Sequence, residues 1–124
     1  MQTREQALIF AREWIEGWNT HDLDRILSHY TDDFELTTPF IVTVMNDPSG
    51  TLRGKAKIRE YWARGLERFP DLEFELIDVF VGVRSLAIYY RAILGKLATE
   101  VLFFDEAGLV NCSAVHYDTL EAKD

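Results

Sequence analysis

The stretch from Trp18 to Pro39, WNTHDLDRILSHYTDDFELTTP, decides the fold of this chain of 124 residues. It predicts the end of one helix, a short second helix, an acidic turn and the first strand of a sheet. Asn19-Thr20-His21-Asp22 interrupts the helical pattern, and Asp22 is suited to cap the second helix. Residues 31–33, Thr-Asp-Asp, signal the turn. The rest of the chain is interpreted around this order of elements.

The first helix and the first strand each have a clear buried face. In the strand, Phe34, Leu36 and Thr38 point to one side and polar residues to the other. Before the stretch, Thr3 followed by Gln6 fits a capping box that starts the helix. Apolar residues then recur with helical spacing, which indicates one buried face; they are Ala7, Leu8, Ala11, Trp14, Ile15 and Trp18.

The remainder of the chain predicts one more helix and four more strands. The helix spans residues 55–68, and the strands span residues 72–83, 86–94, 97–104 and 110–117. Residues 40–45, FIVTVM, are apolar and β-branched and precede a turn-rich segment. The segment Phe40–Gly50 is expected to be a hairpin or extended flap, either over a pocket mouth or as an ordinary packed hairpin or dimer contact. Three helices on a strongly curved mixed sheet give the α+β class.

This order of elements resembles the nuclear transport factor 2-like superfamily, which includes SnoaL-like polyketide cyclases, ketosteroid isomerases, limonene epoxide hydrolases and scytalone dehydratases. The resemblance rests on Tyr30-Thr31-Asp32-Asp33 between a short helix and a strand ending in proline, on Leu52-Arg53-Gly54 before Ile58-Arg59-Glu60-Tyr61-Trp62, and on the turn Phe104–Val110. It implies a single SnoaL-like domain of residues 1–124, a cystatin-like α+β barrel that encloses a conical cavity. The outer sheet face commonly forms a homodimer in this family, and the two-sided apolarity of residues 77–83 agrees with that expectation.

Composition and charge exclude several classes of function. The net charge of −8 argues against nucleic-acid partners, whose affinity depends on Lys and Arg, and against anionic membranes. Cys112 is the only cysteine, and the three histidines lack ligand spacing, so neither a metal site nor a cofactor is expected. No apolar run is long enough to span a bilayer, and the N-terminus lacks a secretory signal pattern. A cytoplasmic protein is therefore expected.

The hairpin between residues 86–94 and 97–104 gives the sharpest prediction about chemistry. If the Gly-Lys pair at 95–96 forms a two-residue turn, Arg91 faces Glu100. Directly opposite side chains lie on one face within about 5.5 Å, so Arg91 and Glu100 are predicted to form an ion pair. Tyr89 and Leu102 would lie farther along that face. The residues alone leave open whether the pair lies in the cavity, at its rim or on the dimer face.

The family resemblance places Glu100 inside the cavity, because it falls where ketosteroid isomerases carry a protonated pocket aspartate. A buried charged pair is costly unless it is well hydrogen-bonded, so such a pair would mark a polar ligand or a site. The rest of the isomerase site is not retained: Trp14, Thr38 and Trp62 stand at its other positions, and only Tyr30 matches. A threonine cannot abstract a proton from carbon without its own base, so ketosteroid isomerase activity is not expected.

The other families of the superfamily are matched only in part. SnoaL-like cyclases present an acid on the last strand, where this chain has Val115 and, three residues farther on, Asp118. Ser113, Val115 and Tyr117 are expected to face the cavity and His116 the dimer interface. Scytalone dehydratases use histidines, and limonene epoxide hydrolases use an acid-Arg-acid arrangement. For the latter, Arg91 and Glu100 would supply two parts and Asp78 is a candidate for the third.

The spacing of the aromatic residues along the helices and strands indicates first of all a packed core. In this fold, however, the core is also the cavity wall, and an aromatic-lined cone with few polar groups suits a flat, mostly apolar small molecule. The expected wall residues besides the polar pair are Trp14, Trp18, Tyr30, Phe34, Thr38, Trp62, Tyr89, Leu102, Ser113, Val115 and Tyr117.

Two hypotheses of function follow. In the first, the chain is a cofactor-independent enzyme of the isomerase, cyclase or hydrolase type that acts on an apolar cyclic or polyketide-like compound. Glu100 would be the general acid/base, oriented by Arg91, with Tyr89 and Tyr117 donating hydrogen bonds. In the second, it is a non-catalytic ligand-binding module or a dimeric assembly domain, because the catalytic residues of each related family are incomplete. Fold alone does not decide between them.

Overall fold

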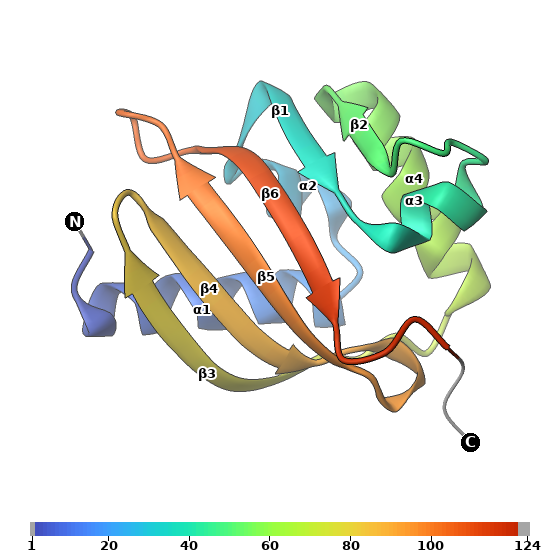
Figure 1. Cartoon of the computed structure of the whole chain (residues 1–124). Helices are drawn as coiled ribbons and strands as arrows, with labels where there is room; N and C mark the ends of the chain where they lie inside the picture. Colours follow the sequence, from blue (N-terminus) through green and yellow to red (C-terminus); the bar gives the residue numbers. More distant parts are fainter. Residues whose placement is uncertain (1, 122–124) are drawn as a thin grey trace.

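The computed structural model describes residues 2–121, which form helices packed on one mixed sheet (Figure 1). The helices are α1 (Arg4–Asn19), α2 (Leu23–Leu27), α3 (Pro39–Val44) and α4 (Lys55–Arg68). The strands are β1 (Tyr30–Thr37), β2 (Thr51–Arg53), β3 (Glu75–Gly82), β4 (Ser85–Arg91), β5 (Leu97–Phe104) and β6 (Val110–Tyr117), with a 3₁₀ turn η1 (Ile93–Gly95) before β5. The predicted α+β class with a mixed sheet is confirmed.

The strand order is β2-β1-β6-β5-β4-β3, with β1 and β6 parallel and all other neighbours antiparallel. Helix α1 passes behind β3, β4 and β5 in Figure 1, and α3 and α4 lie beside β1 and β2. The sheet therefore has an inner face covered by helices and an outer face. No helix within residues 2–121 is long and apolar enough to cross a membrane.

The helix starts are set by the side chains that the sequence places there. Thr3 and Gln6 form the predicted capping box of α1, and the Asp22 carboxylate accepts from the backbone N–H of Arg25 at the start of α2. At its other end, α1 is tied to the sheet, because the Asn19 amide makes two hydrogen bonds with the backbone of Phe74, at 2.6 and 2.9 Å. These bonds occupy the backbone N–H and carbonyl groups of Phe74, which a neighbouring strand would otherwise bind. Strand β3 therefore begins at Glu75 and not at residue 72 as predicted.

Most of the segment 40–45 belongs to helix α3 (Pro39–Val44), and the predicted hairpin or extended flap is wrong. Thr38 is extended and its hydroxyl accepts from the backbone N–H of Phe40, while Pro39 occupies the first turn, where its missing N–H costs nothing. Ile41 is fully buried and fixes the helix on the protein. Tertiary packing and the cap thus override the β-branched composition of the segment.

The predicted register of the β4–β5 hairpin is also wrong. A two-residue turn at 95–96 does not form: Leu94 and Gly95 both have positive φ, 58° and 69°, inside the longer η1 turn. Arg91 therefore pairs with Leu97, and Ile88 lies opposite Glu100. This shift of three residues exchanges the inward and outward residues of β4.

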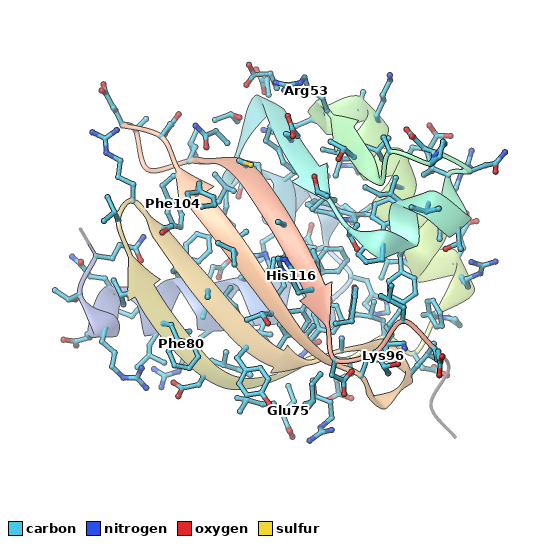
Figure 2. The ribbon with its side chains drawn as sticks, in the orientation of Figure 1. Arg53, Glu75, Phe80, Lys96, Phe104 and His116 are labelled. Carbon is cyan, nitrogen blue, oxygen red and sulfur yellow. The ribbon has the colours of Figure 1, made fainter. Side chains whose placement is uncertain are left out.

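Smaller differences concern strand ends. Residues 31–33 belong to β1 and do not form a separate turn, with an irregular register between Tyr30 and Glu35 in the pairing with β6. Strand β4 ends at Arg91 and not at residue 94. After β6, the chain is held by Lys96, whose buried ammonium donates to the carbonyl oxygens of Thr119 and Glu121 (Figure 2).

Candidate functional site

A cavity of about 480 Å³ lies between the inner face of the sheet, the end of α1, and helices α3 and α4. Eight of its lining side chains are aromatic: Trp18, Phe40, Tyr61, Trp62, Phe69, Phe74, Tyr90 and Tyr117. Its two charged lining residues are Glu100, on β5, and Arg68, at the end of α4. The wall is thus mainly apolar and aromatic, the type of surface that binds flat small molecules.

Glu100 is the acidic residue of this cavity and is held by two hydroxyl groups. Its side chain points inward from β5 and only 5% of the residue is exposed. The Tyr90 hydroxyl donates to one carboxylate oxygen and the Ser113 hydroxyl to the other, both at 3.1 Å. Tyr90 comes from β4 and Ser113 from β6, so the two neighbouring strands fix the carboxyl group from both sides.

Burial raises the pKa of Glu100 to about 7, because the ionised carboxylate loses solvation; the hydrogen bonds from Ser113 and Tyr90 act in the opposite direction. No ion pair to Glu100 forms within residues 2–121. Its protonation is therefore governed by burial and two neutral donors. A carboxyl group that titrates near neutral pH can both donate and accept a proton at that pH.

Other polar groups surround the carboxyl group without ionising. The Trp14 indole N–H donates to the Tyr30 hydroxyl at 3.0 Å, and burial raises the pKa values of Tyr30 and Tyr90 well above their ordinary range. Elsewhere in the wall, Thr38 interacts with the phenols of Tyr61 and Tyr117, whose pKa values are also raised by burial. All these phenols remain protonated hydrogen-bond donors near neutral pH.

The predicted site residues fall into three groups. Those that line the cavity are Glu100, Trp18, Thr38, Trp62, Val115 and Tyr117. Those that are buried behind the lining are Trp14, Tyr30, Phe34, Leu102 and Ser113, of which Ser113 contacts Glu100 directly.

The third group lies outside the cavity. Tyr89 is paired with Thr99 on the opposite sheet face. Arg91 is exposed and lies 3.7 Å from Glu75 on β3, so the predicted Arg91–Glu100 ion pair does not form. Of the other candidates, Asp78 pairs with Arg4 at 2.9 Å and His29 lies 3.3 Å from Glu13.

The sequence-based interpretation missed Tyr90, which takes the place assigned to Tyr89. The signal was present in the alternation of β4: Leu86 and Ile88 are large and apolar and alternate with Ser85 and Ala87, and Tyr90 continues the phase of Leu86 and Ile88. All three are buried. The interpretation also missed the contribution of α3, because a segment expected to be extended supplies wall residues as a helix.

Comparisons with known proteins agree with this fold. The SnoaL-like domain family matches residues 11–101. A SnoaL-like protein of unknown function from Burkholderia thailandensis is 48% identical, with 94% of this chain and 98% of that chain covered and a TM-score of 0.91.

More distant structures share the fold alone. A proposed ketosteroid isomerase from Kribbella flavida is 18% identical, with 98% of this chain and 84% of that chain covered and a TM-score of 0.69. AclR, a proposed hydroxylase from Streptomyces galilaeus, is 17% identical, with coverages of 94% and 77% and a TM-score of 0.70. No curated protein sequence matches the chain.

Proposed function

Given that this chain belongs to the SnoaL-like domain family, we propose that its cavity binds a flat, apolar small molecule. Glu100 transfers a proton to or from this molecule. One observation carries the proposal: a buried carboxyl group with a pKa of about 7 lines an aromatic cavity. General acid/base catalysis is most effective when the pKa of the catalytic group lies near the working pH. Buried carboxyl groups with shifted pKa values are more frequent at functional sites than elsewhere.

The composition of the wall favours a reaction that uses a single acid/base group. Among residues 2–121, Glu100 is the one carboxylic acid that lines the cavity, and no histidine lines it. An epoxide hydrolysis of the acid-Arg-acid type would need a second acid. An isomerisation or a ring closure in which one group removes a proton and returns it elsewhere needs only Glu100. Tyr90 and Ser113 would orient the carboxyl group, and substrate oxygen would accept from the phenol and threonine hydroxyls.

The test is proton exchange on a flat ketone, 2-tetralone, followed by NMR in D₂O. Removal of an α-proton by Glu100 and return of a deuteron exchange the position without net reaction. We expect the wild-type protein to accelerate this exchange and Glu100→Gln to lose the acceleration while still binding the ketone. Glu106→Gln, a change in an exposed turn, serves as the matched control. Equal exchange by wild type and Glu100→Gln, or none by either, contradicts proton transfer.

A second role, self-association, is supported by the outer face of the sheet. The register aligns Phe80, Ala87, Val101 and Ala114 in one row across β3, β4, β5 and β6. Phe80 is 57% exposed and Phe103, on the same face, is 44% exposed. Figure 2 shows Phe80 and His116 on this side of the sheet. Exposed apolar surface of this kind is typical of interfaces, so we propose that two copies pair through this face.

A further inference from the structure

We propose that the ligand of the cavity is an organic anion, a flat apolar carboxylic acid whose carboxylate binds Arg68. The inference rests on the proposed function, since it concerns the molecule that the cavity holds, and it adds a chemical class to it.

Arg68 stands where the cavity meets the surface. It is the last residue of α4, is exposed, and lines both the main cavity and a neighbouring hollow of about 330 Å³. The two hollows also share residues from the segments 69–72 and 92–94, so they lie next to each other at this point. A ligand in the main cavity can therefore contact Arg68, which lines it.

Arg68 has no carboxylate partner among the residues that the structure describes. This distinguishes it from other arginines of α4, because Arg59 pairs with Asp24 at 2.5 Å and Arg64 with Glu60 at 2.7 Å. Asp71 and Glu73 line the adjacent hollow, but neither forms an ion pair with Arg68. Its five N–H donors remain free for a planar acceptor such as a carboxylate.

The wall of the cavity carries several hydroxyl groups. The hydroxyl groups of Thr38, Tyr61 and Tyr117 line it, whereas the carboxyl oxygens of Glu100 already accept two hydrogen bonds. A ligand that carries acceptor oxygens can accept hydrogen bonds from these hydroxyl groups.

The overall charge of the protein makes a local cation necessary for such a ligand. With a net charge of −8, the surface as a whole repels anions. A basic residue in the last turn of α4 also interacts favourably with the helix dipole, a role that needs no ligand. That role concerns the stability of the helix and predicts no preference for an anionic over a neutral probe. Arg64 lies one turn earlier on α4 and is paired with Glu60, so it is the control for the general charge of this helix.

The experiment compares 2-naphthoate with its neutral isostere 2-naphthamide. Binding is followed at pH 6 and low ionic strength by quenching of tryptophan fluorescence, since Trp18 and Trp62 line the cavity. We expect wild type to prefer the anion by about fivefold, the upper range for a partly exposed ion pair. Arg68→Gln should remove this preference and keep naphthamide affinity, whereas Arg64→Gln should keep both. The preference should also fall as salt is added.

The possible failures are distinguishable. Equal binding of the two probes by wild type, or a preference that survives in Arg68→Gln, overturns the assignment of an anionic ligand while the binding of flat molecules stands. An equal loss of preference in Arg64→Gln overturns it as well, because the effect would then belong to the general charge of the helix end. If neither probe binds wild type, the proposed binding function is contradicted and the inference fails with it.

Discussion

Two glutamates of this chain show how strongly position decides the chemistry of one side chain. The Arg25 guanidinium, 2.5 Å from Glu13, lowers the pKa of that carboxyl group to about 2, with a smaller contribution from His29. Glu100 has only hydroxyl partners, and burial raises its pKa to about 7. Glu13 is therefore a fixed anion at every physiological pH, whereas Glu100 changes its charge near neutrality.

The raised pKa of Glu100 predicts a specific pH dependence of stability. The unfolded chain binds this proton with the ordinary pKa of about 4.5 and the folded chain with about 7. The stabilisation is therefore complete below about 4.5 and is lost as the pH rises through about 7. The loss is on the order of 3 kcal/mol. Glu100→Gln lacks this titration, so its stability relative to wild type should increase from pH 5 to pH 8.

Urea unfolding of both proteins at several pH values measures this difference directly. The other carboxyl groups titrate in both proteins and cancel in the comparison. Parallel pH profiles of wild type and Glu100→Gln would show that Glu100 has an ordinary pKa and would remove the basis of the proposed chemistry.

Tyr90 and Tyr89 form a natural pair for the next prediction, because adjacent residues of β4 lie on opposite sheet faces. Tyr90→Phe removes a hydrogen bond to Glu100 that is strongest when the carboxylate is charged. We expect this variant to lose about 1 kcal/mol more stability at pH 8 than at pH 5. Tyr89→Phe should show no such difference. Thermal unfolding at the two pH values tests this, and equal behaviour of the two variants would contradict the hydrogen-bond assignment.

At the level of single residues, the sequence predicts which side chains are buried better than it predicts which residues lie opposite each other on neighbouring strands. The inward positions of Phe34, Leu36 and Thr38 follow from alternation and are confirmed. The partner of Arg91 does not follow from alternation, because it depends on the length of a turn elsewhere in the chain. An error of three residues in that turn replaced Tyr90 by Tyr89 in the predicted site.

At the level of elements, the β4–β5 connection and α3 are the parts that the sequence alone left undetermined. Gly95-Lys96 fits a two-residue turn, yet Leu94 adopts a left-handed conformation that bulky residues seldom adopt. Residues 40–45 have β-branched composition, but Thr38 caps them as a helix. By contrast α4, β5 and β6 have the predicted bounds, because their apolar periodicity is long and unambiguous.

Helix α4 offers a test of the cavity through its glycine. Gly65 lines the cavity, has no unusual backbone conformation, and a methyl group added to it meets nothing within 4 Å. Gly65→Ala should therefore stabilise the protein by about 0.5–1 kcal/mol, the usual gain of alanine over glycine in a helix. Gly65→Leu should fill cavity space and weaken naphthamide binding at least tenfold while the protein stays folded.

Urea unfolding and fluorescence quenching measure the two effects separately. If Gly65→Leu stays folded and binds naphthamide as tightly as wild type, the probe lies somewhere other than this cavity. If Gly65→Ala destabilises the protein, the space beside α4 is smaller than the structure shows.

At the level of the whole molecule, the two faces of the sheet have different proposed roles. The inner face and the helices enclose the cavity, and the outer face presents the row from Phe80 to Ala114. Val101 lies in the middle of that row, so Val101→Glu should convert a dimer into a monomer by placing two like charges in the interface. Ile9→Glu changes an exposed apolar residue of α1 instead and should leave the dimer intact.

Sedimentation equilibrium of the three proteins decides this prediction. A monomeric wild type would contradict the proposed interface, and so would a dimer that persists in Val101→Glu. The folded state of each variant is checked by circular dichroism, because both changes are on the surface and should preserve the helices and the sheet.

A ¹³C NMR titration of the glutamate carboxyl groups tests directly whether Glu100 is the acid/base group of the cavity. The Glu100 signal is assigned by its loss in Glu100→Gln. We expect Glu100 to titrate with a midpoint near 7 and 2-naphthamide, bound in the cavity, to shift this midpoint. A Glu100 midpoint near 4.5, or one that the bound probe leaves unchanged, would contradict the claim that this residue is the acid/base group of the cavity.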